Sequence, residues 1–121
     1  MKSLDARISL NDIMPILAEF TESAKSIYGQ HLKKVILFGS FARNEQTADS
    51  DIDVFLIVDM SVDELKKFDH DISDASYDVT ILYDIPMYPI AVSQQQFERY
   101  RNVSQFYQNV CHDGKIIYSR D

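Results

Sequence analysis

Apolar residues recur along this 121-residue chain with a period that changes from helical to strand-like several times. Between residues 12 and 28 they are spaced three and four apart, which predicts an amphipathic helix with Asn11 as its N-cap, Pro15 near its first turn and Gly29 at its end. Residues 34–38 (KVILF) predict a short buried strand that stops before Gly39. Residues 51–58 (DIDVFLIV) predict a second strand; its later half is apolar on both faces, so we expect it in the middle of a sheet.

The second half of the chain alternates between helix and strand signals. Capping-box patterns at residues 61–64 and 93–96 predict helices, the first directing Leu65, Phe68 and Ile72 inward and the second centred on Phe97 and Tyr100. Residues 77–83 (YDVTILY), 89–92 and 115–118 predict further strands, and a short helix is expected between the last two, ended by Gly114. These elements predict a single α/β (α+β) domain over residues 1–121, with a mixed sheet of about four or five strands and helices packed on it.

Composition narrows the class of protein. The chain is 45% hydrophobic and 26% charged, which is ordinary for a globular domain. Its formal net charge of −7 argues against direct nucleic-acid binding; it suits a site that gathers divalent cations, or serves solubility alone. The single cysteine, Cys111, excludes an internal disulfide and favours a cytoplasmic setting, and we expect neither a signal peptide nor a membrane span.

Two short segments carry candidate chemistry. Gly39-Ser40 follows a predicted strand, where glycine permits a sharp turn and close approach to a ligand, and the following N–H groups can form an anion-binding nest. Asp51 and Asp53 are two residues apart on a strand, so they share one face with Cα atoms roughly 6.6 Å apart. Such a pair is costly without a cation and can converge on magnesium ions. Taken alone, the first segment could be an ordinary turn and the second a solvated strand end.

A third carboxylate is expected from a later strand. Asp78 lies one residue into the predicted strand 77–83, and it reaches the Asp51/Asp53 face if the two strands are neighbours. Asp74 and Asp84, before and at the end of that strand, are alternatives. Phosphoryl-type transfer relies on positioning and charge neutralisation, and these groups together suit it: Ser40 and the nest for phosphates, the aspartates for Mg²⁺ and for deprotonating a hydroxyl.

The segment from Gly39 to Asp53 resembles the G-S-x-A-R…S-D-x-D signature of the DNA polymerase β-like nucleotidyltransferase superfamily, and in particular its minimal nucleotidyltransferase (MNT) family. The matching residues are Gly39, Ser40, Ala42, Arg43, Ser50, Asp51 and Asp53. The resemblance implies a nucleotidyltransferase fold, catalytic and metal-binding roles for Asp51, Asp53 and Asp78, and nucleotide binding by Gly39, Ser40, Arg43 and Ser50. Asn44 stands where relatives often carry glycine, and asparagine tolerates the same left-handed backbone.

The resemblance also implies a reaction and a partner. Stand-alone MNT chains of this size resemble the antitoxin half of HEPN–MNT toxin–antitoxin pairs, which use ATP and Mg²⁺ to transfer AMP onto a tyrosine of the HEPN ribonuclease toxin. Two alternatives stay open: a small-molecule nucleotidyltransferase of the aminoglycoside-modifying kind, and a non-catalytic antitoxin that acts by binding alone. Aromatic residues gathered in the C-terminal half suit either a partner interface or the core. The sequence leaves the oligomeric state and the nucleotide preference open.

Overall fold

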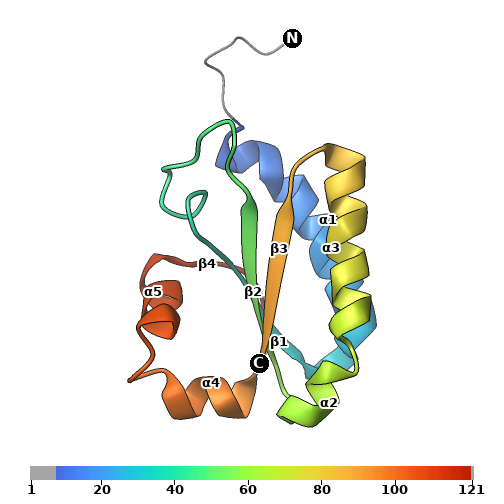
Figure 1. Ribbon diagram of the computed structural model, residues 1–121, viewed down its shortest axis with the longest axis vertical. Helices are drawn as coiled ribbons and strands as arrows, with labels where there is room; N and C mark the ends of the chain where they lie inside the picture. The colour runs from blue at the N-terminus through green and yellow to red at the C-terminus, as the bar shows by residue number, and fades with distance from the viewer. Residues whose placement is uncertain (1–7, 121) are drawn as a thin grey trace.

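The computed structural model describes residues 8–120, which form a four-stranded sheet and the helices packed on it (Figure 1). A single 3₁₀ turn, Gly29–His31, links the first helix to the first strand. In chain order the elements are α1 Leu10–Tyr28, β1 Leu32–Phe38, β2 Ile52–Val58, α2 Val62–Lys66, α3 Asp69–Tyr83, β3 Met87–Ser93, α4 Gln94–Tyr100, α5 Gln105–Asp113 and β4 Lys115–Ser119.

The sheet is mixed, as the sequence predicts, with strand order β3-β2-β1-β4. β1 pairs antiparallel with both β2 and β4, and β2 pairs parallel with β3. The parallel pair requires a crossover, which α2 and α3 supply. β2 is central, and this confirms the expectation drawn from its doubly apolar sequence.

Helices cover both faces of the sheet and create two apolar cores (Figure 1). α1 and α3 pack on one face, against residues such as Val54 and Leu56 of β2. α4 and α5 pack on the other, against Phe55 and Ile57. Because successive strand residues face opposite sides, Asp53 shares the α4/α5 face with Phe55.

The first helix begins earlier than its sequence pattern suggests. Its N-cap is Ser9 rather than Asn11, because Ser9 Oγ accepts from Asp12 N–H while the Asp12 carboxylate accepts from Ser9 N–H. Pro15 therefore lies inside the helix, beyond its first turn. Gly29 ends the helix with a positive φ of 61°, as expected.

The predicted strand at residues 77–83 is wrong, because this segment is the second half of helix α3. The run of β-branched residues at positions 79–81 suits a strand, but the burial pattern is helical: Ile72, Ser76 and Val79 are buried at spacings of four and three. Tyr77, Ile81 and Leu82 consequently face solvent, with 64%, 66% and 66% of their surfaces exposed. The helix expected from residue 61 is split in two, with Leu65 on α2 and Ile72 on α3.

The other C-terminal elements follow the sequence closely. Residues 89–92 belong to β3, residues 115–118 belong to β4, and Gly114 is the C-cap of α5. Ser93 precedes α4, but its side chain makes no capping hydrogen bond, so the second capping box does not form. Of the clustered aromatics, Phe97 and Tyr107 belong to the core, whereas Tyr88, Tyr100 and Phe106 are exposed.

β3 is an edge strand whose open side offers few hydrogen-bond donors. Ile52 N–H donates to the Pro86 carbonyl at 2.8 Å, so in this parallel pair the backbone groups of Met87 and Pro89 face away from β2. Met87 N–H donates instead to Thr80 Oγ1 of α3 at 3.2 Å, and Pro89 has no N–H.

No helix in the described part of the chain is long and apolar enough to cross a bilayer.

Candidate active site at the start of the second strand

Gly39 and Asp53 are in close contact at the point where β1 ends and β2 begins. Phe38 pairs with Asp53 across the two strands, and Gly39 follows with a φ of +78°. A Cβ atom on Gly39 would lie 2.3 Å from Asp53 Oδ2 and 3.2 Å from its Cγ. Both the backbone conformation and the contact with Asp53 therefore require glycine, whereas the close approach to a ligand that the sequence predicts here stays a prediction.

Residues 40–44 form a tight turn directly after Gly39. Arg43 N–H donates to the Gly39 carbonyl at 3.2 Å and Asn44 N–H to the Phe41 carbonyl at 3.3 Å, as in a first helical turn. The N–H groups that precede Arg43 lie at the open end of this turn, where a helix start binds anions. Asn44 has a φ of 57°, so it does adopt the left-handed backbone expected of it.

Asp51 and Asp53 repel each other at the edge of the α4/α5 face. Both are half-buried. Burial raises the pKa of Asp53, the nearby negative charge of Asp51 raises it further, and the positive charge of Arg43 partly opposes the rise. A divalent cation would relieve this repulsion, and Mg²⁺ is commonly held by one or two carboxylates plus substrate phosphates. The two aspartates fit such an ion, although no group of three or more candidate ligands occurs within residues 8–120.

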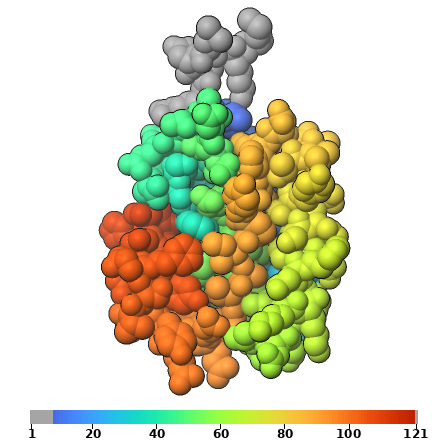
Figure 2. Space-filling view, in the orientation of Figure 1, coloured from blue at the N-terminus to red at the C-terminus, as the bar shows by residue number. Residues whose placement is uncertain are grey.

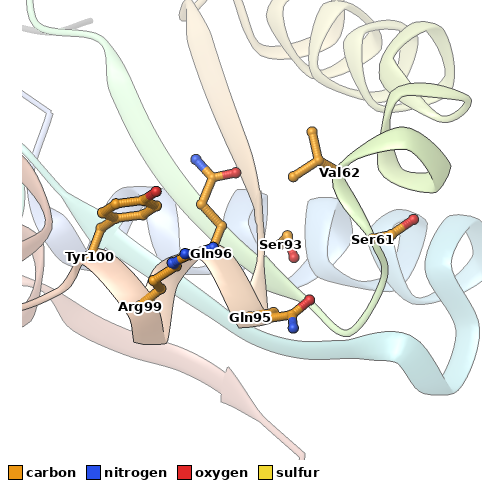
Figure 3. Close-up of a pocket in the computed structure, with 7 residues that line it drawn as sticks. All are labelled: Ser61, Val62, Ser93, Gln95, Gln96, Arg99 and Tyr100. Atoms are coloured by element: carbon orange, nitrogen blue, oxygen red, sulfur yellow. The ribbon is translucent and has the colours of Figure 1, made fainter.

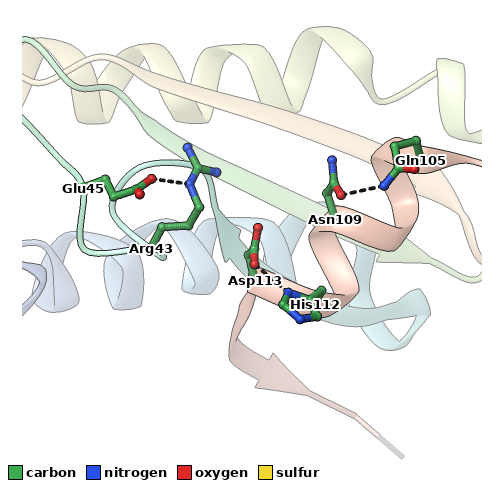
Figure 4. Close-up of polar contacts among 6 residues, drawn as sticks. All are labelled: Arg43, Glu45, Gln105, Asn109, His112 and Asp113. Atoms are coloured by element: carbon green, nitrogen blue, oxygen red, sulfur yellow. Dashed lines mark hydrogen bonds and ion pairs between the residues drawn. The ribbon is translucent and has the colours of Figure 1, made fainter.

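Arg43 and Ser50 frame the two segments of the site. Arg43 Nε donates to Glu45 Oε1 at 2.7 Å in an exposed ion pair, and Figure 4 shows its terminal nitrogens directed away from Glu45. The ion pair with Glu45 therefore engages Nε of Arg43 and leaves the terminal nitrogens directed elsewhere. Ser50 Oγ accepts from Thr47 N–H at 2.8 Å, so it shapes the loop before Asp51.

Asp78 does not join this pair. The prediction placed it on a strand beside Asp51 and Asp53, but Asp78 is an exposed residue of α3. α3 packs on the sheet face opposite to that of Asp53, so the sheet itself separates them. The two alternative candidates for the third carboxylate do not join the pair either. Asp74 pairs with His70 on the same helix, and Asp84 is the exposed, left-handed C-cap of α3. β3, the strand that does lie beside β2, pairs Tyr88 with Asp53 and has no carboxylate.

A hollow of about 180 Å³ opens beside Gly39 and reaches α5. Its lining residues are Phe38, Gly39, Arg43, Phe106, Asn109, Val110 and Asp113. The contribution of α5 was not predicted, because no local pattern in residues 105–113 marks this helix as a neighbour of Gly39.

A larger hollow of about 460 Å³ lies at the other end of the sheet (Figure 3). It is bordered by Ser61, which follows β2, and by Ser93, which ends β3, together with Arg99 and Tyr100 of α4. Asp51 and Asp53 are at the opposite end of β2, so this hollow is separate from the aspartate pair.

Known proteins resemble this chain in both sequence and structure. Residues 17–109 match the family model described as "Nucleotidyltransferase domain". "Putative protein adenylyltransferase" of Methanocaldococcus jannaschii is 34% identical over 102 residues, which cover 84% of this chain and 94% of the relative.

Solved structures show the same fold at low sequence identity. One is a crystal structure of a toxin–antitoxin with AMP-PNP, with a TM-score of 0.59 at 17% identity, covering 86% of this chain and 73% of the other. Another is a tri-AMPylated Shewanella oneidensis HEPN toxin in complex with MNT antitoxin, with a TM-score of 0.54 at 14% identity, covering 92% and 73%. The family match spans most of the chain and the fold agrees with it, so this protein belongs to the nucleotidyltransferase domain family and has a nucleotidyltransferase fold.

Proposed function

We propose that this protein transfers AMP from ATP to a tyrosine hydroxyl of a HEPN-type toxin and so acts as its antitoxin. The observation that carries the proposal is the packing of Asp53, beside Asp51, against the Gly39 bend. This places two carboxylates opposite a turn with open N–H groups, the arrangement that a triphosphate and its cation need.

The proposed transfer is a substitution at phosphorus. The tyrosine oxygen forms a bond to the α-phosphorus of ATP, the bond from that phosphorus to the bridging oxygen breaks, and pyrophosphate leaves with the electron pair. The hydroxyl proton passes to solvent or to a carboxylate of the site. Ser40 and the turn at residues 40–44 hold phosphate oxygens, Arg43 adds a positive charge, and Asp51 and Asp53 hold Mg²⁺. When bound, Mg²⁺ neutralises charge on the phosphates and the leaving group.

A protein acceptor is supported by the surface around the site. β3 lies open on one face of the molecule between α3 and the C-terminal helices (Figure 2). Tyr88 is 56% exposed and pairs with Asp53, so an exposed aromatic ring borders the aspartates. Ile90, two residues further along β3 and on the same face, is 38% exposed. Exposed apolar surface of this kind is typical of an interaction site. The names of the relative and of the solved complexes, a protein adenylyltransferase and toxin–antitoxin pairs, agree with this choice.

The experiment supplies the protein with Mg²⁺, each of the four nucleoside triphosphates and the helical protein encoded beside its gene. Intact-mass spectrometry then measures the adduct, and peptide mapping locates it. We expect an AMP adduct on tyrosine with the wild type and none with Asp53→Asn. Asp78→Asn is the matched control, because it removes one carboxylate charge from the opposite face.

The three candidate activities give different outcomes. An adduct on an aminoglycoside but not on the protein would indicate the small-molecule enzyme. Toxin inhibition that survives alanine at both Asp51 and Asp53 would indicate an antitoxin that acts by binding alone. No adduct with any nucleotide refutes the proposed transfer.

A further inference from the structure

The hollow beside Gly39 has two chemically different ends. One end consists of Gly39 and Arg43, which belong to the proposed phosphate site. The other end consists of side chains of α5 that no part of the proposed transfer uses: Phe106, Asn109 and Asp113. A volume of about 180 Å³ is below the roughly 300–1,000 Å³ of pockets that enclose a whole ligand, so the hollow suits one part of a nucleotide.

Phe106 offers a braced aromatic surface in this hollow. Its ring makes edge contacts with Phe38, at 5.5 Å between centroids, and with Phe55, at 5.9 Å. Nevertheless 40% of the residue is exposed. Aromatic rings held in this way are stacking surfaces for nucleobases, which every base can use because each has a π face.

Asn109 and Asp113 lie one helical turn apart on α5 (Figure 4), and both line the same hollow as Phe106. Asn109 Oδ1 accepts from Gln105 Nε2 at 2.9 Å, which fixes the amide and leaves its NH₂ group directed away from Gln105. Asp113 Oδ1 contacts His112 Nδ1 at 2.8 Å, and its carboxylate faces the side on which Arg43 lies. The hollow therefore combines a donor from Asn109 with an acceptor from Asp113.

We propose that the α5 end of this hollow binds the nucleoside of the substrate, with Phe106 stacking on the base and Asn109 and Asp113 reading its polar edge. The proposal rests on the proposed function, because it takes the triphosphate to lie on Ser40 and Arg43. An ionised carboxylate only accepts hydrogen bonds, so Asp113 favours a base with an amino group, such as adenine, over one with a carbonyl oxygen in that place. Asp113 is thus a residue that determines nucleotide specificity.

The test compares the binding of ATP and of inosine triphosphate (ITP), which differ in this way at the 6-position of the purine. Titration calorimetry with Mg²⁺ should show ATP binding about tenfold more tightly than ITP, the size expected for one hydrogen bond. In Asp113→Asn the difference should fall to about twofold or less, because an amide can also donate to a carbonyl oxygen. Asp63→Asn, an exposed aspartate on α2, is the charge-matched control and should keep the wild-type ratio.

A second pair of variants tests the stacking surface. Phe106→Ala should weaken ATP and ITP equally, by roughly 5- to 100-fold, while Phe106→Tyr keeps the ring and retains affinity. Neither change should alter the binding of Mg²⁺-tripolyphosphate, which probes the phosphate end alone and reports that the variant is folded. Unchanged ATP affinity in Phe106→Ala overturns the proposal.

Amide NMR shifts separate failure of this inference from failure of the proposed function. ATP should shift signals from residues 39–44 and from residues 105–113. Shifts confined to residues 39–44 overturn the nucleoside site and leave the transfer activity standing. Shifts in both segments without any transfer to a partner overturn the proposed function and leave the nucleoside site standing. No shift and no heat with any nucleotide overturn both.

Discussion

Replacing Gly39 by alanine tests whether the Asp53 carboxylate is the reason for glycine at the bend. The new Cβ would lie 2.3 Å from Asp53 Oδ2, well inside normal contact distance. Overpacking of this kind typically costs about 1–3 kcal/mol. The backbone φ of +78° adds about 1–2 kcal/mol for any residue with a side chain. The total of about 2–5 kcal/mol is a large share of the roughly 5–15 kcal/mol that stabilises a typical domain.

The assay is urea unfolding followed by circular dichroism in metal-free buffer, for Gly39→Ala alone and in an Asp53→Ala background. The Asp53→Ala background removes the contacts with Oδ2 and Cγ and leaves only Cβ of residue 53, at 3.3 Å, so the cost of Gly39→Ala should fall toward the backbone share of about 1–2 kcal/mol. Gly29→Ala is the matched control: φ there is +61°, and nothing lies within 4 Å of the added Cβ. Its cost should therefore not depend on Asp53. An equal cost for Gly39→Ala in both backgrounds would refute the argument from the carboxylate.

Further predictions concern the carboxylates and the core. Because the folded state raises the pKa of Asp53, its ionisation destabilises the fold above the ordinary carboxyl pKa; metal-free Asp53→Asn should therefore be more stable than wild type at pH 7, and the gap should close as the pH falls below about 4. Mg²⁺-ATP at one hundred times its Kd should stabilise the wild type by about 2.7 kcal/mol in thermal unfolding, an effect that alanine at both Asp51 and Asp53 should abolish. Asp78→Asn should leave the AMP transfer rate within about twofold of wild type, since surface changes away from a site are usually near neutral. Phe55→Ala should cost about 3–5 kcal/mol in urea unfolding, because its fully buried ring contacts four other rings. These arguments would be contradicted if Asp53→Asn were less stable than wild type at pH 7, or if the double alanine variant were still stabilised by Mg²⁺-ATP. Loss of AMP transfer in Asp78→Asn, or an unfolding cost below about 1 kcal/mol for Phe55→Ala, would contradict them as well.

The site could be predicted from the sequence where its chemistry is local. Gly39 and Ser40 follow β1 directly. Asp53 is on β2 as expected, while Asp51 lies one residue before the strand begins, and neither placement needs the rest of the fold. The left-handed backbone of Asn44 could be expected from the resemblance, because asparagine tolerates that conformation at a position where glycine is common.

The prediction failed where tertiary packing decides the outcome. The segment 77–83 (YDVTILY) suits a strand by composition. It is helical because it continues α3, whose residues Ile72, Ser76 and Val79 are buried against the sheet at helical spacing. Once this segment is a helix, Asp78 moves to the opposite face and the expected third carboxylate is lost. The contribution of α5 could not be predicted at all, because the position of Asp113 beside Gly39 depends on how α5 packs across the sheet.

The open side of β3 also bears on how copies of this chain behave in a crowded cell. A strand from another molecule could not form a continuous ladder of hydrogen bonds with β3. The N–H of Met87 already donates to Thr80, and Pro89 has no N–H. Edge-to-edge polymerisation through this strand is thereby discouraged, even though apolar side chains surround it. A partner that binds at this edge must therefore contact mainly the side chains of β3. The chain can in this way expose an apolar binding surface without nucleating fibrils.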